Sequence, residues 1–409
     1  MSGLKERTKK HKMNNVKDIF DTYKLHSKDI EIPMEQVKRE LQPYENKIVL
    51  YGAGSAGIAF LHYLMDAGIF PCYFADGDKE KHGRMCEGFE IIAPEAITER
   101  VGSDALVIVT INTDGKSYCK DFKKELLAGG HQGVHKRLKE CGCSNVIDYT
   151  YFRRCYQLFQ GEKYNLPACS DVYSMLEKQD LIEKAFSALE DDMTKNTFLK
   201  LLEFRLLTDQ VEIPTLPEKG MYFEYDLFPK IDDEVFIDCG ACGGSSLSDF
   251  LKINRHCFRA YYGIEPDKTN FGKLEKFVSQ LPVNEQDKMK IYHAAAYDKV
   301  GETNFFILNG PGSFQAYNGP DRIKTIKIDD ILDKEEATYI KMNIEGSEVA
   351  ALKGAEYTIR NYHPRMAIMG YHKTSDFWEV PLLIKEYYGD YHLNLRSYMR
   401  NVAFAYYAY

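Results

Sequence analysis

The most informative segment of the chain reads Glu234-Val-Phe-Ile-Asp-Cys-Gly-Ala-Cys-Gly-Gly244. Its apolar run predicts a buried strand that ends in an acidic residue, and its glycines predict a tight turn. The following residues, through Leu251, predict a helix, and Ala260-Tyr-Tyr-Gly-Ile-Glu265 predicts a second strand that also ends in an acid. Strand, glycine turn, helix and strand in this order are typical of a doubly wound α/β unit.

An earlier part of the chain repeats this pattern. It reads Lys47-Ile-Val-Leu-Tyr-Gly-Ala-Gly-Ser-Ala-Gly57, continues into a predicted helix, and then reads Cys72-Tyr-Phe-Ala-Asp76. The glycines match the spacing G-x-G-x-x-G, and the acid follows about 20 residues later, as in dinucleotide-binding units. The pattern taken alone predicts a nucleotide-type site at Gly52, Gly54, Gly57 and Asp76.

The composition is that of an ordinary globular protein. The chain has 409 residues, of which 44% are apolar and 28% are charged. At roughly 100–200 residues per domain, this length predicts two to four domains. The formal net charge is −8, which is unfavourable for binding nucleic acid or anionic lipid. We therefore expect no nucleic-acid partner.

The cysteines and the hydropathy pattern bear on localisation. The ten cysteines are scattered, which is typical of a reduced, intracellular protein. The basic start of the chain leads into no apolar segment of a secretory signal, and no run approaches the length of a membrane span. We expect a cytoplasmic protein with no membrane span.

The pattern along the chain predicts an α/β protein with two Rossmann-like units joined by a helical connector. In the second unit, five crossover strands are followed by an antiparallel terminal hairpin, Tyr391–Tyr398 with Ala403–Tyr409, a layout that dinucleotide dehydrogenases usually lack. The predicted regions are an N-terminal helical segment, a Rossmann-like accessory module, the connector and the second α/β domain, at residues 1–43, 44–150, 151–230 and 231–409.

Ligands of open α/β sheets bind outside the carboxyl ends of the strands. Glycines there let the backbone approach a ligand closely, and Glu265 is placed to accept hydrogen bonds from a ribose diol. The residues at the five strand ends of the second unit are Asp238 with the glycine turn, Glu265, Ala294–Ala296, Asn343 with Glu345, and Tyr371–Lys373.

Four motifs in order resemble those of FkbM-type methyltransferases. They are Phe236–Gly244, Ile264-Glu-Pro266, Ile340-Lys-Met-Asn-Ile-Glu-Gly-Ser-Glu348 with Ala351–Ala355, and Met369-Gly-Tyr-His-Lys-Thr-Ser-Asp376. The resemblance covers about 180–409. It implies a class I seven-stranded methyltransferase fold that binds S-adenosylmethionine and methylates an oxygen, often of a sugar or a secondary metabolite.

The resemblance also implies roles for single residues. Glu265 would hold the ribose, Ala295 would lie near the adenine, and Tyr222 would close over the cofactor. The fourth-strand motif and His372 would face the methyl group and the acceptor. The implied cofactor-binding set is Tyr222, Asp238, Gly240, Ala241, Gly244, Ser245, Glu265 and Ala295.

The chain departs from the family pattern at Asn343, where the family usually has Asp. Asn keeps the shape and the hydrogen-bonding capacity but loses the negative charge and any capacity to act as a base. If that carboxylate is essential, the chain is impaired or only binds the cofactor. If the carboxylate only orients other groups, activity survives.

Methylation of a hydroxyl needs a group that removes its proton, which contributes about 10²–10⁴-fold. We predict His372 as this base, because its ordinary pKa is about 6.5, and Glu345 is the alternative. A divalent metal held by Asn343, Glu345 and His372 is a third way to activate a hydroxyl. We expect no metal site.

Residues 45–150 resemble the small Rossmann-like modules of bacterial sugar N-acetyltransferases and sugar C-methyltransferases. The resemblance rests on Asp76–Gly83, Gly88–Glu95 and Ala105–Thr110. It leaves open whether the module is a scaffold or oligomer contact, handles a nucleotide-sugar, or binds NAD.

The sequence thus predicts an O-methyltransferase that moves the methyl group of S-adenosylmethionine to a hydroxyl of a sugar, glycan precursor or related metabolite. The expected partner is a sugar or nucleotide-sugar acceptor, and a homo-oligomer is a possible assembly. Asn343 motivates one alternative, a non-catalytic cofactor-binding or assembly protein. The N-terminal glycine motif motivates another, an NAD-linked sugar oxidoreductase.

Overall fold

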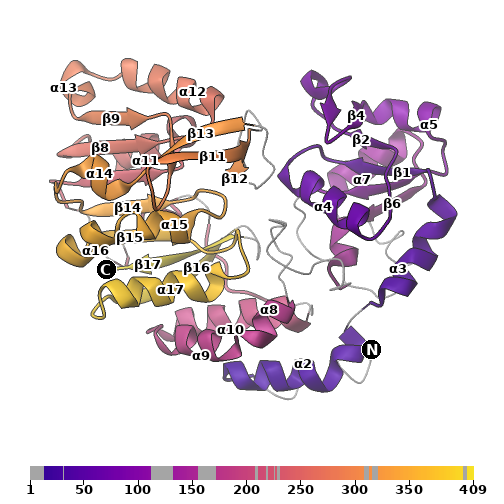
Figure 1. Cartoon of the computed structure of the whole chain (residues 1–409), viewed down its shortest axis with the longest axis horizontal. Helices are drawn as coiled ribbons and strands as arrows, with labels where there is room; N and C mark the ends of the chain where they lie inside the picture. Colours follow the sequence, from indigo (N-terminus) through magenta and orange to yellow (C-terminus); the bar gives the residue numbers. More distant parts are fainter. Residues whose placement is uncertain are drawn as a thin grey trace. The chain divides into compact units, whose positions relative to one another are not determined.

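The computed structural model describes residues 13–30, 32–111, 132–154, 172–207, 211–217, 220–224, 226–227, 231–307, 313–315, 321–398 and 403–409. The chain divides into two compact units, Met1–Phe186 with Lys195–Ile213, and Ser187–Thr194 with Pro214–Tyr409. Both are built on largely parallel sheets with helices (Figure 1). The predicted α/β fold class is confirmed.

The N-terminal unit has a six-stranded sheet with the order β3-β4-β2-β1-β5-β6. All neighbours pair in parallel except β3, which is antiparallel to β4. Every residue of β1 and β5 is buried, as in strands that are covered on both faces. The strands are β1 (Ile48–Tyr51), β2 (Tyr73–Ala75), β3 (Met85–Cys86), β4 (Phe89–Ile92), β5 (Leu106–Val109) and β6 (Asn145–Asp148).

The predicted N-terminal helical segment is helical where the structure describes it, and residues 1–12 lie outside the described residues. The α-helices of this part are α2 (Val16–Ile30), α3 (Met34–Leu41), α4 (Ser55–Asp66), α5 (Ile97–Arg100) and α7 (Gln132–Glu140). The 3-10 helices are η1 (Gln42–Tyr44), η2 (Lys79–Lys81), η3 (Pro94–Ala96) and η4 (Tyr149–Arg154).

In the predicted connector, the described residues form the α-helices α8 (Val172–Glu177), α9 (Gln179–Ser187) and α10 (Asp192–Leu207). Its apolar residues at helical spacing are buried, among them Ile182 and Phe198. The helices therefore form for the reason that the sequence indicates, which is burial of one face.

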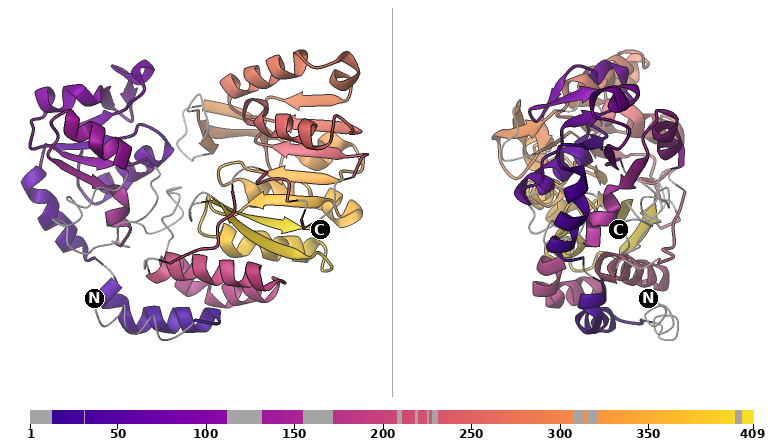
Figure 2. Two further views of the ribbon diagram at one scale, coloured as in Figure 1. Left: turned by 180° about the vertical axis from the view of Figure 1, so that it is seen from behind. Right: turned by 90° about the vertical axis from the view of Figure 1, so that its right-hand side faces the viewer.

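The C-terminal unit has a seven-stranded sheet with the order β16-β17-β15-β14-β7-β8-β9. Figures 1 and 2 show the strands stacked from β9 at one edge to β16 at the other. The five strands from β15 to β9 are parallel, and β17 is antiparallel to both neighbours. The strands are β7 (Val235–Cys239), β8 (Ala260–Ile264), β9 (Met289–Tyr292), β14 (Tyr339–Met342), β15 (Arg365–Met369), β16 (Leu393–Tyr398) and β17 (Ala403–Ala408).

The strand order places a reversal at the centre of this sheet. From β7 the chain runs outward to β8 and β9, and then returns to β14 on the other side of β7. Ligands of open α/β sheets bind at such a reversal. The helices of this unit are α11 (Ser245–Ile253), α12 (Lys268–Ser279), α13 (Val283–Gln286), α14 (Ile328–Leu332), α15 (Glu348–Lys353), α16 (Glu356–Tyr362), α17 (Asp376–Tyr387) and the 3-10 helix η6 (Cys242–Gly244).

Two segments of this unit are interrupted. β9 ends at Tyr292, and β10 (Ala295–Ala296) pairs with β13 in a separate four-stranded sheet. Between α15 and α16, Gly354 lies so close to Tyr297 that a Cβ would come within 2.0 Å of its carbonyl oxygen. The remaining strands of the small sheet are β11 (Gly301–Phe306), β12 (Phe314–Gln315) and β13 (Asp321–Ile326).

An aromatic cluster forms part of the core of the C-terminal unit. The ring of Phe236 in β7 lies 4.7 Å from Phe250 in α11 and 5.5 Å from Tyr339 in β14. Phe223 packs on Phe236 at 5.7 Å, and each such pair adds about 0.5–1.5 kcal/mol to the burial of the rings. The cluster thereby anchors the segment that carries Tyr222. Within the described parts of the chain, no helix has both the length and the apolar character needed to cross a bilayer.

Candidate functional site

A cavity lies at the central reversal of the seven-stranded sheet, where β7 and β14 end side by side. The cavity brings together seven of the predicted site residues, which come from five separate parts of the chain. The predicted residues on its wall are Tyr222, Gly240, Ser245, Glu265, Ala295, Asn343 and Glu345.

The glycine turn after β7 depends on Gly240. Its φ is +82°, and a Cβ at this position would lie 2.1 Å from the carbonyl oxygen of Asn343. Only glycine therefore allows the end of β7 to approach the end of β14 this closely. Gly244 also has a positive φ, at +94°, and it precedes α11 together with the buried Ala241.

Asp238 lies beneath this turn, away from the cavity wall. It is fully buried, and its carboxylate accepts hydrogen bonds from Lys341 Nζ at 3.0 Å, Ser246 Oγ at 2.5 Å and Tyr261 Oη at 3.0 Å. All three donors belong to the protein. Asp238 thus stabilises the glycine turn through hydrogen bonds within the protein and does not line the cavity.

Lys341 is a residue that the sequence analysis missed. Its ammonium group also donates to the carbonyl oxygens of Cys239 and Gly240, at 3.2 and 2.7 Å, and lies 4.8 Å from the ring centre of Tyr222. Burial lowers the pKa of Lys341, but the neighbouring Asp238 carboxylate outweighs burial and raises it above its ordinary value. The sequence offers only a lysine within the otherwise apolar segment Ile340–Met342 as a signal, and the register of the strands supplies its partner.

Glu265 lies at the end of β8 on the cavity wall. Its two carboxylate oxygens accept hydrogen bonds from the backbone N–H groups of Cys242 and Asp267, at 2.8 and 2.9 Å. Each oxygen keeps a further lone pair for a ligand. Burial raises the pKa of this carboxyl group. Hydrogen bonds donated by a bound ligand would stabilise its ionised form.

Asn343 and Tyr222 form a pair in the cavity wall. The Asn343 Nδ2 group donates a hydrogen bond to the hydroxyl oxygen of Tyr222 at 2.9 Å. The Oδ1 atom of Asn343 is buried and has no hydrogen-bond partner in the described structure. An Asp here would accept a hydrogen bond from the tyrosine, whereas Asn leaves both its own acceptor and the tyrosine proton available to a ligand.

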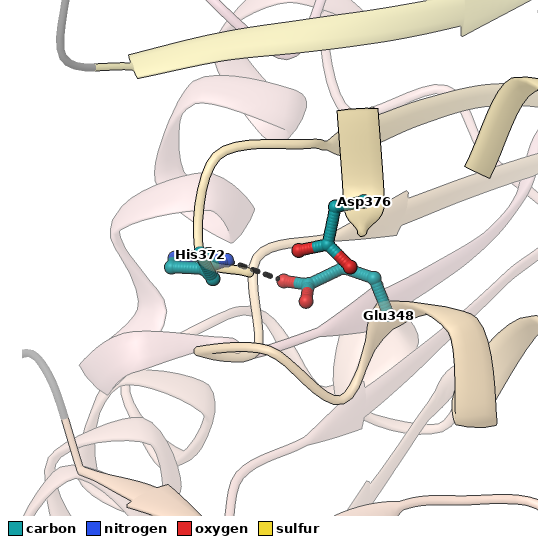
Figure 3. Close-up of side chains that lie close together, drawn as sticks. All are labelled: Glu348, His372 and Asp376. Atoms are coloured by element: carbon teal, nitrogen blue, oxygen red, sulfur yellow. Dashed lines mark ion pairs between the residues drawn. The ribbon is translucent and has the colours of Figure 1, made fainter. Parts of the chain in front are cut away.

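His372 lies between two carboxylates. Its Nδ1 atom forms an ion pair with Glu348 Oε1 at 2.8 Å, and its Nε2 atom lies 3.6 Å from Glu345 Oε2. Figure 3 shows His372 and Glu348 together with Asp376 of α17. Glu348 is a second residue that the sequence analysis did not assign to the site, although it closes the quoted motif Ile340–Glu348.

The charge of His372 bears on its predicted role as a base. Burial lowers its pKa, but Glu348 and Glu345 outweigh burial and raise the pKa of His372 to about 9. The imidazole is therefore protonated at neutral pH and holds no lone pair for a further proton. Glu345, by contrast, lines the cavity with 29% of its side chain exposed, and burial raises its pKa.

Asp376 completes a buried group of three potential metal ligands, Glu348, His372 and Asp376, whose ligand atoms lie within 4.8 Å of one another. Its Oδ2 atom accepts a hydrogen bond from the backbone N–H of Lys373 at 2.8 Å. Burial and the nearby Glu348 raise the pKa of Asp376 to about 7. The group differs from the Asn343, Glu345 and His372 set considered for a metal above.

The charge of His372 predicts a pH-dependent stability. Because its pKa is higher in the folded state than in the unfolded chain, His372 stabilises the fold fully below about pH 6.5, and this contribution disappears as pH rises through about 9. We expect His372→Gln to be less stable than the natural chain by about 1–3 kcal/mol at pH 6 and by much less at pH 9.5. Urea unfolding of both proteins at several pH values measures the difference, and a difference that does not change with pH would contradict the prediction.

The glycine turn of the N-terminal unit is required by its own packing. The φ of Gly52 is +114°, and a Cβ on Gly57 would lie 2.0 Å from the carbonyl oxygen of Gly52. A Cβ on Gly54, in contrast, would meet no atom within 4 Å. Two of the three predicted glycines therefore have a structural reason that involves no ligand.

Asp76 is hydrogen-bonded to the glycine turn of the N-terminal unit. Its carboxylate accepts hydrogen bonds from the backbone N–H of Ala53 at 2.9 Å and from Lys81 Nζ at 3.0 Å. Burial raises the pKa of Asp76, but hydrogen bonds from Asp78, Lys81 and Ala53 outweigh burial and lower it. The carboxylate that the motif assigns to a ribose is thus engaged by the protein itself.

The strand order of the C-terminal unit, its glycine turn and the acid at the end of β8 define a Rossmann-like unit with the seven-stranded layout of class I methyltransferases. Residues 238–406 match the family model described as the methyltransferase FkbM domain. This part of the chain is therefore a methyltransferase domain, and the protein is an enzyme of the methyltransferase class, as predicted.

One solved structure is similar over nearly the whole chain. It is a methyltransferase FkbM from Methylobacillus flagellatus KT, with 22% identity, coverage of 96% of this chain and 98% of that chain, and a TM-score of 0.63. The likeness supports the fold of both units. The N-terminal domain of human METTL16 in complex with SAH has 14% identity, covers 55% of this chain and 90% of that chain, and has a TM-score of only 0.29. Among curated proteins, none matches the chain.

Proposed function

We propose that the protein transfers the methyl group of S-adenosylmethionine to a hydroxyl group of a sugar, glycan precursor or related metabolite. One observation carries this proposal: the predicted cofactor residues Gly240 and Glu265 and the acidic residue Glu345 face a single cavity at the central reversal of the sheet. A methyl donor and an acceptor hydroxyl need a shared space of this kind, because the reacting atoms have to be in line.

The residues around the cavity fit this cofactor. Glu265 would accept hydrogen bonds from the ribose hydroxyls through its remaining lone pairs, and Ala295 would flank the adenine. Gly240 lines the cavity and would face the methionine end with its backbone. The buried Oδ1 atom of Asn343 lacks a partner, and a bound amine or hydroxyl would supply one. When bound, S-adenosylmethionine supplies a methyl group activated by the sulfonium charge.

Glu345 is the base that the geometry favours. It would take the proton of the acceptor hydroxyl while the acceptor oxygen forms its bond to the methyl carbon. His372 is buried, carries a proton at neutral pH, and stands behind Glu345. We therefore assign deprotonation of the acceptor hydroxyl to Glu345, which the sequence offered as the alternative to His372. This assignment also makes an acid at position 343 unnecessary, and so favours an active enzyme over a binding-only relative.

The accessory module is proposed as a scaffold or oligomer contact. Both oxygens of Asp76 accept backbone hydrogen bonds, as those of Glu265 do, but Asp76 also forms an ion pair with Lys81 at 3.0 Å, which supports this reading over NAD binding. For the same reason we favour the methyltransferase function over that of an NAD-linked oxidoreductase. We keep the domain boundaries 44–150 and 231–409, a sugar or nucleotide-sugar acceptor and a cytoplasmic location as parts of the proposal.

Calorimetric titration with S-adenosylhomocysteine tests the cofactor site. We expect micromolar binding to the natural chain and a loss of about 10- to 100-fold in Glu265→Ala, because a charged acceptor at a ligand contributes about 1.5–3 kcal/mol. Glu265→Gln retains an acceptor and is expected to lose less.

The control is Asp76→Ala, which removes the corresponding acid of the N-terminal motif and is expected to bind as the natural chain does. Absence of binding to the natural chain would overturn the cofactor assignment and make the assembly alternative the first choice. Binding that is lost in Asp76→Ala but kept in Glu265→Ala would place the cofactor in the N-terminal unit and contradict its assignment to the C-terminal cavity.

A further inference from the structure

The N-terminal unit has a groove that the proposed reaction does not use. Its volume is about 340 Å³, which is large enough to bind part of another molecule, since binding cavities measure roughly 300–1,000 Å³. The groove lies between the end of α3 with η1 and the segment that joins α4 to β2. Its apolar wall includes Leu41, Ile48 and Ile69, which belong to the core of this unit or pack against it. The core therefore holds this wall in place.

The groove lies at the edge of the sheet opposite to the one that binds ligands in this type of fold. Ile48 is the first residue of β1, and Phe70 precedes β2, which pairs with β1 in parallel. The groove is thus at the amino ends of these strands, whereas ligands of open α/β sheets bind outside the carboxyl ends. This position favours a protein surface as the occupant over a nucleotide or a nucleotide-sugar.

Phe70 is an apolar residue of this groove that remains largely in water. It lines the groove and is 58% exposed, although burial of an aromatic ring is strongly favourable. An exposed apolar surface with polar residues around it is typical of a site that binds another molecule. The same face thus offers an exposed ring and a recess with apolar walls, which are the two parts of an aromatic contact.

Two opposite charges line the same groove. Lys38 belongs to α3, and Glu45 follows η1. Neither side chain forms an ion pair or a hydrogen bond with another described residue. In a two-fold contact each residue pairs reciprocally, so Lys38 of one copy meets Glu45 of the other at two equivalent positions. A groove with one charge of each sign is complementary to itself in this arrangement, and the charges therefore favour a second copy of the chain as the occupant.

We propose that this groove is the contact between two copies of the chain in a two-fold dimer. Phe70 of each copy enters the groove of the other, and Lys38 and Glu45 form two reciprocal ion pairs across the contact. The inference rests on the part of the proposed function that makes the accessory module an oligomer contact. It adds where that contact lies and what it binds.

Sedimentation velocity of the full chain at micromolar concentrations tests the proposal. We expect the natural chain to sediment with the mass of two chains. Phe70→Ser removes the ring, and we expect it to raise the dissociation constant of the dimer by about 10-fold or more, because buried aromatic residues carry much of the affinity of an interface. The control is Met85→Ser, which changes an exposed apolar residue of β3 in the same unit and should leave the dimer intact.

Charge reversal tests the two-fold geometry. Lys38→Glu and Glu45→Lys each set like charges against each other at both positions, and each is expected to weaken the dimer by about 10- to 100-fold. The double variant restores both pairs with the charges exchanged and should dimerise as the natural chain does. A mixture of the two single variants also sets opposite charges against each other at both positions. We therefore expect the mixture to form a dimer that neither variant forms alone.

The matched control for charge is Lys79→Glu. Lys79 is exposed in η2, which follows the carboxyl end of β2, and this variant changes the net charge as Lys38→Glu does without touching the groove. We expect it to dimerise like the natural chain. Circular dichroism of each variant verifies that the fold is retained.

Three outcomes would overturn the proposal. The first is a natural chain that sediments as single chains, which would leave the groove to a small apolar molecule or to another protein. The second is a dimer that survives Phe70→Ser and both charge reversals, because the contact would then lie elsewhere. The third is a dimer that both charge reversals weaken but that neither the double variant nor the mixture restores, because the charges would then not pair across a two-fold axis.

Titration with S-adenosylhomocysteine keeps this test separate from that of the methyltransferase. It measures binding to the cavity of the C-terminal unit, which Lys38, Glu45 and Phe70 do not line. We expect Phe70→Ser to bind as the natural chain does. Failure of the natural chain to bind would overturn the cofactor assignment without affecting the dimer, whereas a monomeric natural chain would overturn the dimer without affecting the cofactor assignment.

Discussion

Lys341→Met is expected to lower the free energy of unfolding of the C-terminal unit by about 3–5 kcal/mol, the usual result of breaking a buried ion pair. The ammonium group and the Asp238 carboxylate are both fully buried, and their strands place them directly opposite each other. Met retains the length of the side chain but leaves Asp238 charged with one donor fewer. It also leaves the carbonyl oxygens of Cys239 and Gly240 without their shared donor.

The chain offers a specific probe for this measurement. Its only tryptophan is Trp378, which is buried in α17 of the C-terminal unit. Tryptophan fluorescence during denaturant unfolding therefore reports on this unit, which matters because a chain of two units need not unfold in one step.

Two variants serve as controls. Lys252→Met removes an exposed partner of Asp249, with 70% of the lysine side chain accessible, and should cost at most about 1 kcal/mol. The double variant Asp238→Asn with Lys341→Met removes both charges and should recover much of the loss. A cost below about 1 kcal/mol for Lys341→Met alone would contradict the role of Lys341 as the support of the glycine turn.

Glu345→Gln is expected to reduce methyl transfer by about 10²–10⁴-fold while binding of S-adenosylhomocysteine changes little. Gln has the same size and fits the same backbone position but cannot accept the proton of the acceptor. The assay follows labelled methyl groups from S-adenosylmethionine to a panel of sugars and nucleotide-sugars. The natural chain first defines the acceptor in that panel.

Asn343→Asp is the matched comparison, because it restores the acid that the family usually has at this position. If Glu345 is the base, we expect turnover to stay within about tenfold of the natural chain. A rise of 100-fold or more in Asn343→Asp, with little loss in Glu345→Gln, would show that the missing carboxylate at position 343 limits the enzyme. The binding-only alternative would then regain its support.

Several features were predictable because they depend on local pattern. The mostly apolar runs before Asp238, Glu265 and Asn343 form parallel strands, as expected of short buried runs that alternate with helices. The terminal hairpin was predictable from its short turn. The glycine at position 240 indicated a close approach of the backbone. The atom that it approaches is the carbonyl oxygen of Asn343, which follows a strand about 100 residues later in the chain.

Other features were not predictable, because they depend on which residues the fold makes neighbours. Lys341 is an unremarkable lysine until the register sets it against Asp238. Asp76 matches a ribose-binding position in sequence, but hydrogen bonds from Ala53 and Lys81 engage it within the protein. Local spacing cannot exclude such a contact, because a carboxylate pairs with whichever donor lies within reach.

The sequence by itself determined the class of the protein: two α/β units, a methyltransferase domain at the C-terminal end, and the strand ends that carry its site. Only the tertiary structure decided how the charges are distributed among His372, Glu345 and Glu348. The reason is that the pKa of a buried group depends on the charges within a few ångströms of it. In His372 two carboxylates outweigh burial, and the residue expected to accept a proton already holds one.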